Sequence, residues 1–284
     1  MSLPLPSSLS PSKVSTFKDC ALAFRFSAID RLPEPPSAPA MKGSLVHRAL
    51  ELLFTAPPAE RTIQAAIGAL GAATHEMTSD PEFERLGLDE TARAAFLDDA
   101  HTMVERYFTL EDPTSFDPIG IELRLEVEVG DLLLRGIIDR LDLDTDGELV
   151  VTDYKTGRVP SEAQEMARLG GVHFYSLLCE RLFGRRPARV QLMYLGPNPQ
   201  IIVARPTEQS TAGLERKVRA IWTAVERACR DDDFRPKPSH LCNWCSFQEW
   251  CPAFGGDPSQ APKRAETITL SSTPSASEGV PVTR

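Results

Sequence analysis

The sequence lacks several features that would place it in a specialised class of protein. No apolar run approaches the roughly 18 to 20 residues that a membrane-spanning helix needs, so we do not expect an integral membrane protein. Residues 1–10 lack the basic start and apolar stretch of a secretory signal, which favours a cytoplasmic protein. No segment repeats at a fixed period. A Walker A phosphate loop is also absent, so any helicase activity would have to come from a partner protein.

Positive charge is in the minority. The chain has 31 Lys and Arg against 40 Asp and Glu, which gives a net charge of −9. Proteins that coat nucleic acid without specificity are usually basic, whereas an enzyme whose carboxylates hold metal ions can be acidic. The charge is uneven: residues 1–50 contain six Lys or Arg, and a second basic cluster consists of Arg181, Arg185, Arg186 and Arg189. Each cluster either contacts phosphates or is solvated surface.

Only six cysteines are present, and three of them are close together in the sequence. A reducing compartment disfavours a disulfide framework. Cys242, Cys245 and Cys251 have the spacing C-x₂-C-x₅-C, which indicates a metal site that needs a fourth ligand. The candidates for that ligand are Cys20, Cys229 and His240. A site that includes Cys20 would join the two ends of the domain and stabilise it by closing a long loop.

Helical periodicity comes first along the chain, and strand alternation follows it. We expect helices at residues 11–17, 43–54, 60–77 and 89–110, then strands at 119–129, 132–143 and 148–156. A helix at 161–183, strands at 189–195 and 201–204, and a helix at 207–230 complete the prediction. Pro, Ser, Thr and Gly dominate from residue 257, so we expect a disordered tail over 257–284. This order predicts a mixed α/β fold and excludes a Rossmann fold or a barrel.

Two carboxylates and a lysine follow apolar runs in neighbouring predicted strands. Asp139 interrupts one strand, and Asp153 ends the next one along the chain. Lys155 follows Asp153 by two residues, so the period of a strand puts both side chains on one face. Two carboxylates brought together by a hairpin repel each other unless a cation lies between them. Oxygen ligands of this kind suit Mg²⁺ or Mn²⁺, and the lysine could hold an attacking water or stabilise negative charge.

These motifs together resemble the RecB-like exonuclease group of the PD-(D/E)XK nucleases. The resemblance rests on GIIDRLD at residues 136–142, on VTDYKTG at 151–157 and on a G-x-x-x-H motif from Gly43 to His47. It implies an α/β core like that of restriction endonucleases, with a mixed central sheet flanked by helices. It also implies a nuclease domain over 1–256, with a helical insertion at about 55–115 and a catalytic core at about 117–230. The implied metal ligands are His47, Asp139, Asp153 and the Tyr154 carbonyl, and the implied catalytic residues are Asp139, Asp153, Lys155 and Tyr175.

The same resemblance implies a [4Fe–4S] cluster on Cys20, Cys242, Cys245 and Cys251, whereas the spacing alone suits Zn²⁺ nearly as well. The family usually has Gln four residues before Tyr175, and this chain has Gly171 there, so one substrate contact is missing.

The expected function is a metal-dependent DNA exonuclease that acts on single strands or DNA ends in repair or recombination. The alternatives are a CRISPR-associated nuclease of spacer acquisition, a catalytically weak DNA-binding module, and a zinc-ribbon interaction protein.

Overall fold

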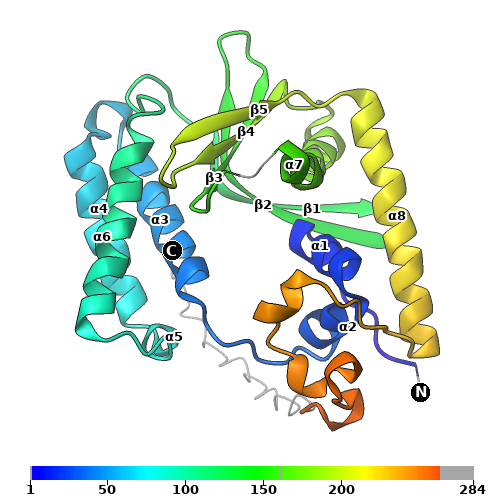
Figure 1. The fold of residues 1–284 in the computed structure, drawn as a ribbon. Coiled ribbons are helices and arrows are strands. Elements are labelled where there is room, and N and C mark those ends of the chain that lie inside the picture. The colour runs from blue at the N-terminus through cyan, green and yellow to red at the C-terminus, as the bar shows by residue number, and fades with distance from the viewer. Residues whose placement is uncertain (1, 160–161, 263–284) are drawn as a thin grey trace, which may run out of the picture.

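A computed structural model describes residues 2–159 and 162–262 of the chain. Five strands form one mixed sheet in the order β1-β2-β3-β4-β5 (Figure 1). Their bounds are β1 Gly120–Val129, β2 Leu132–Leu143, β3 Leu149–Lys155, β4 Arg189–Tyr194 and β5 Gln200–Ala204. The β3–β4 pair is parallel, whereas the other three neighbouring pairs are antiparallel. The predicted mixed sheet flanked by helices is therefore confirmed.

Helices cover both faces of this sheet. The α-helices are α1 Pro11–Asp19, α2 Ala21–Phe24, α3 Ala38–Phe54, α4 Ile63–Thr78, α5 Pro81–Glu84, α6 Glu90–Tyr107, α7 Glu162–Phe183 and α8 Glu208–Asp231. A π-helical turn, η1, spans Arg25–Ile29, and the 3₁₀ turns are η2 Pro58–Glu60, η3 His240–Trp244, η4 Gln248–Trp250, η5 Pro252–Phe254 and η6 Pro258–Gln260. Within the described ranges no helix is both long and apolar enough to cross a membrane.

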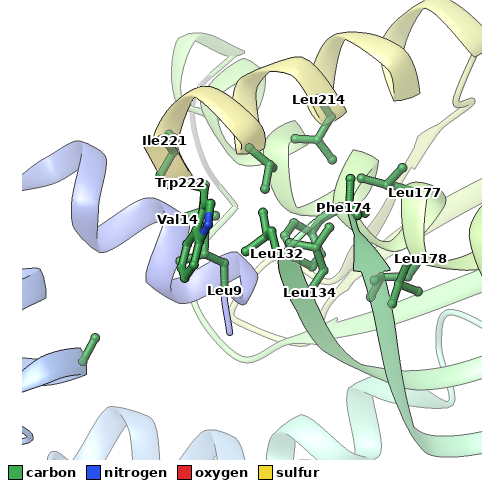
Figure 2. Packing of buried hydrophobic residues seen from close by; sticks show 14 of the residues in the cluster. Leu9, Val14, Leu132, Leu134, Phe174, Leu177, Leu178, Leu214, Ile221 and Trp222 are labelled. Carbon is green, nitrogen blue, oxygen red and sulfur yellow. The ribbon is translucent and has the colours of Figure 1, made fainter. Parts of the chain in front are cut away.

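Two hydrophobic cores lie on opposite faces of the sheet. The end of β4 shows the division, because Leu192 and Tyr194 belong to one core and Met193 and Leu195 to the other. The helices α1, α7 and α8 cover the first core, and α3, α4 and α6 cover the second (Figure 1). Figure 2 shows the first core, where side chains from α7 and α8 meet those of β2 and the N-terminal segment: Leu9, Val14, Leu132, Leu134, Phe174, Leu177, Leu178, Leu214, Ile221 and Trp222.

All five predicted strands are present, and their ends differ from prediction by at most one residue. The helix predicted from residue 43 instead begins at Ala38, because the Ser37 side chain accepts a hydrogen bond from the Ala40 amide and caps it. The segment predicted as an exposed linker, residues 78–87, contains α5, whose Phe83 is buried. Within the stretch predicted as a disordered tail, residues 258–260 form the turn η6, which the Asp257 side chain caps, and residues 263–284 lie outside the described residues.

The alternation of side chains between the two faces of the sheet is interrupted at one rung between β1 and β2. Leu123 packs against the first core and Ile121 against the second, although strict alternation predicts one face for both. Between them Glu122 has a left-handed backbone, with φ of 47°. Its opposite residue is Asp139, and this pair is absent from an otherwise continuous register. The distortion therefore coincides with one of the predicted metal ligands.

Candidate active site

The candidate site lies where β2 and β3 separate. Their pairing runs only from Leu143↔Leu149 to Arg140↔Thr152, whereas β3 continues beside β4 as far as Lys155. The next rung would pair Asp139 with Asp153. A cleft of about 710 Å³ opens beside the freed end of β3, and α1, α3, α7 and α8 all contribute to its lining. Five predicted site residues line it, namely His47, Asp153, Tyr154, Lys155 and Tyr175.

His47 connects α3 to both catalytic strands. Its Nδ1 lies 3.6 Å from Oδ2 of Asp139, and its Nε2 lies 3.1 Å from the carbonyl oxygen of Tyr154. Gly43, one turn earlier, allows this approach, since a Cβ there would lie only 3.2 Å from Oγ1 of Thr156. Burial lowers the pKa of His47, which favours the neutral ring that a metal ligand requires.

Three potential ligand atoms converge on the distorted rung. One atom each from His47, Glu122 and Asp139 lies within 4.8 Å of the other two. Burial, followed by the negative charge of Asp153, raises the pKa of Asp139 to about 7. Burial also raises the pKa of Glu122, with a further contribution from the charge of Asp139. Such repulsion among buried acids is what a bound cation would relieve.

Glu122 is the site residue that the sequence analysis missed. It lies on the polar side of an alternating strand, next to solvent-exposed Arg124 and Glu126, so the pattern marks it as ordinary surface. Its local sequence carries no signal for a left-handed backbone, which glycine or asparagine usually adopts. Only the tertiary register, which puts it opposite Asp139, relates it to the site.

Asp153 and Lys155 lie on one face of β3, as the period of the strand predicts, and their side chains are in contact. Asp153 is buried, and among the described residues its Oδ2 has no hydrogen bond of good geometry besides this ion contact. Tyr175 of α7 lies against the same carboxylate, and burial, then the charge of Asp153, raises the pKa of the phenol. Gly136 on β2 brings α7 close, because a Cβ there would lie 2.7 Å from Cδ1 of Leu178. An incompletely satisfied buried carboxylate fits a metal-binding site.

Comparison with known proteins identifies the family. Residues 8–252 match the model of the PD-(D/E)XK nuclease superfamily, which is most of the chain. The chain belongs to this superfamily. Nucleases of the PD-(D/E)XK superfamily use divalent metal ions and act on DNA, and the donors around the cleft suit such an ion.

Two further proteins resemble this PD-(D/E)XK chain. The Gene 69 protein of Mycobacterium phage D29 is 24% identical over 277 residues, covering 86% of this chain and 96% of the phage protein. A crystal structure named "Putative exonuclease", from Eubacterium rectale, aligns with a TM-score of 0.55 at 11% identity, over 84% of this chain and 87% of that chain. The structural likeness supports the PD-(D/E)XK fold.

A buried cation supports the site from the other face of the sheet. Arg140 is almost fully buried and forms ion pairs with Glu111 and with Asp142. It also donates a 3.0 Å hydrogen bond to the hydroxyl of Tyr154 and stacks over the ring of Phe116 at 4.6 Å. The family motif thus places Asp139 and Arg140 side by side in sequence but on different sides of the sheet. Arg140 fixes the ring of Tyr154, whose backbone faces Asp139 and His47.

The four predicted cluster cysteines lie around one cavity of about 250 Å³, although one of them is more than 200 residues from the rest. They are Cys20, Cys242, Cys245 and Cys251. Burial raises the pKa of Cys245, and the other three thiols add to this shift because they are neighbours. Phe26 packs against Phe247, with ring centres 5.4 Å apart, and holds the two ends of the chain together there. The remaining cysteines are buried elsewhere.

The second basic cluster of the sequence is neutralised within the protein. Each of its arginines forms an ion pair with a carboxylate: Arg181 with Glu215, Arg185 with Glu148, Arg186 with Glu180, and Arg189 with Asp144. Of the two interpretations of this cluster, the structure favours surface ion pairs over phosphate contacts.

The α7 helix runs through position 171 without a break, so a helix start there does not replace the missing glutamine.

Proposed function

We propose that the protein is a divalent-metal-dependent deoxyribonuclease, of the RecB-like exonuclease group, that hydrolyses phosphodiester bonds in this cleft. The observation that carries the proposal is the convergence at the open end of β2 and β3. There His47, Glu122 and Asp139 offer ligand atoms within 4.8 Å of one another, and the Asp153–Lys155 pair lines a cleft to which His47 also contributes. Carboxylates, an imidazole and a lysine around one site form the chemical set that metal-assisted phosphodiester hydrolysis requires.

The residues divide into ligands and groups that act on the substrate. His47, Glu122, Asp139, Asp153 and the Tyr154 carbonyl are the proposed ligands of Mg²⁺ or Mn²⁺. When bound, such an ion would lower the pKa of a water and neutralise charge on the scissile phosphate. The ammonium group of Lys155 would orient the water whose oxygen forms the new P–O bond. The bond from phosphorus to the leaving oxygen breaks, and the proton that the water releases ends on that leaving oxygen. Tyr175, held against Asp153, would position the phosphate by donating from its protonated hydroxyl.

The proposed substrate is a DNA end, single-stranded where it enters the cleft, in repair or recombination in the cytoplasm, with a helicase as a possible partner. A CRISPR-associated nuclease of spacer acquisition would have the same site, and its genome neighbourhood would distinguish it. A DNA-binding module of weak activity is another alternative, and Gly171 in place of the family's glutamine favours it.

A nuclease assay tests the proposal. Linear and circular DNA, single- and double-stranded, are incubated with Mg²⁺, Mn²⁺ or EDTA. We expect cleavage of linear DNA with either metal, none with EDTA, and none of circles if the enzyme needs an end. Asp153→Ala and Lys155→Ala should abolish cleavage, whereas Asp146→Asn, in the exposed turn of the same hairpin, should not. Full activity of either site variant would contradict the proposed chemistry.

We further propose that the four clustered cysteines bind a [4Fe–4S] cluster rather than Zn²⁺. Four thiolates around one zinc ion stand about 4 Å apart, because each Zn–S bond is about 2.3 Å. Among the described residues no three cysteine sulfurs lie within 4.8 Å of one another. In a four-iron cluster each thiolate binds a different iron, so the thiolates are further apart, and all four cysteines line one cavity of about 250 Å³.

A further inference from the structure

Two lysines in the cleft have no part in the proposed chemistry. Lys18 lies in the last turn of α1 and Lys217 in the middle of α8, and both are exposed to solvent where they line the cleft that contains Asp153. The two helices pack against each other, so residues 199 positions apart in the chain become neighbours. Partial burial, then the adjacent charge of Lys18 within hydrogen-bonding reach, lowers the pKa of Lys217.

Three other basic residues of the N-terminal cluster are already paired. Arg25, Lys42 and Arg48 each form an ion pair with a carboxylate. Among the residues that the structure describes, no carboxylate lies within ion-pair distance of Lys18 or Lys217. The dipole of α1 stabilises a cation at Lys18, but Lys217 is far from either end of α8 and has no such compensation. Two adjacent ammonium groups repel each other unless an anion lies between them.

Further features give this corner of the cleft a positive character in an acidic protein. The cleft is lined by three lysines, including Lys155, against two aspartates, Asp19 and Asp153. The Nζ of Lys237 donates a 3.0 Å hydrogen bond to the carbonyl oxygen of Lys18, which adds another positive charge and anchors the end of α1. A concave corner that is rich in lysine favours the approach of a polyanion, although the protein as a whole has a net charge of −9.

We propose that Lys18 and Lys217 together bind one backbone phosphate of the DNA strand whose scissile bond lies at Asp153. This inference rests on the proposed nuclease function and names a substrate contact for it. Phosphate contacts of this kind fix the register of a strand without reading its sequence. The pair would therefore hold the strand while Lys155 and the metal ligands act on a neighbouring phosphate.

The test is the salt dependence of binding to a fluorescent single-stranded oligonucleotide in EDTA, where the strand is not cut. Wild type is compared with Lys18→Gln, Lys217→Gln and the double variant. Loss of one phosphate contact lowers the magnitude of the slope of log K against log salt by about 0.7. We expect this decrease in slope in the double variant, together with severalfold weaker binding at about 50 mM salt. Each single variant should already show most of the decrease in slope. Arg230→Gln is the matched control, because it removes one charge from the same helix about 20 Å from Lys217.

The outcomes separate this inference from the proposed function. If wild type cleaves DNA but the double variant retains the affinity and slope of wild type, the lysine site is wrong and the nuclease assignment stands. A double-variant slope change of about 1.4, twice that of each single variant, would indicate two independent phosphate contacts and overturn the shared site. If wild type neither binds nor cleaves DNA, both proposals fail. Thermal melting of all variants checks that each one is folded.

Discussion

The backbone amide of Tyr154 donates a 2.7 Å hydrogen bond to Oδ2 of Asp139. The carbonyl of the same residue faces Nε2 of His47 at 3.1 Å, and its hydroxyl accepts a hydrogen bond from Arg140. One residue thus links β2, β3 and α3 through its amide, its carbonyl and its side chain. The position of the Asp139 carboxylate is therefore set by the backbone of β3, and not only by its own strand.

Asp139→Asn should reduce metal-dependent cleavage about 100-fold or more while leaving the fold intact. Asparagine can still accept the hydrogen bond from the Tyr154 amide, but it removes one negative charge from the proposed metal site. Initial cleavage rates at saturating Mg²⁺, with circular dichroism spectra, provide the measurement. A variant that keeps the wild-type rate would show that Asp139 is not a metal ligand.

The raised pKa of Asp139 should make the metal-free protein less stable as the pH increases. Burial and the charge of Asp153 raise this pKa from 3.8 to about 7 in the folded state. At a pH between these two pKa values, Asp139 keeps its proton in the folded state but has lost it in the unfolded state. The contribution of Asp139 to the free energy of unfolding is fully present below about pH 4. It falls by up to about 4 kcal/mol as the pH rises through about 7.

This pH dependence is measured by urea unfolding in EDTA at several pH values. In the Asp139→Asn variant the fall between about pH 4 and 7 should be much smaller, because position 139 no longer titrates. Identical pH profiles for the two proteins would contradict the assigned pKa. Added Mg²⁺ should restore stability to wild type above pH 7 and have less effect on the variant.

Arg140→Met should destabilise the protein by about 3–5 kcal/mol. The substitution leaves Glu111 and Asp142 without their buried cation, and it removes the hydrogen bond to Tyr154. Arg135→Met on the same strand, whose arginine forms an exposed pair with Glu126, should change stability by less than about 0.5 kcal/mol. Urea unfolding of the two variants gives both values, and equal values would mean that the Arg140 network is not a source of stability.

Glu122→Gln should increase the Mg²⁺ concentration required for half-maximal cleavage by about tenfold. The substitution keeps the size of the side chain near His47 and Asp139 but removes its charge. Glu126→Gln, four residues later on the same strand and exposed, is the control and should leave the Mg²⁺ requirement unchanged. The prediction fails if the two variants have the same metal dependence.

Protein purified without oxygen should be brown and contain about four irons per chain. Cys20→Ser and Cys251→Ser should lose the colour and lower the melting temperature, because the two ends of the domain lose a common anchor. Cys229→Ala should keep the iron, since that thiol contacts the carbonyl of Pro4 instead. A finding of one zinc ion per chain and no colour would contradict the iron–sulfur cluster and indicate a structural zinc site instead.

The sequence by itself determined the five strands and the longer helices of this protein. Alternation with a period of two marks β1 and β2, because buried and exposed side chains alternate along part of each strand. An apolar run that is buried on both faces marks β3. The same period places Asp153 and Lys155 together, because residues two apart in a strand share a face. The resemblance of short motifs to a nuclease family then pointed to His47 and Asp139 and to the four cysteines. All these signals are local, or are carried by motifs of a few residues.

The tertiary structure alone decided which distant groups meet. Glu122 joins the site through the register of β1 against β2 and a left-handed backbone that no local sequence signal marks. Lys18 and Lys217 become neighbours because α1 and α8 cover the same core. The arginines of the second basic cluster pair with carboxylates from other elements, which their own spacing does not reveal. Such contacts depend on the packing of whole elements, and the free energy of that packing is spread over both cores, so no single segment of sequence encodes them.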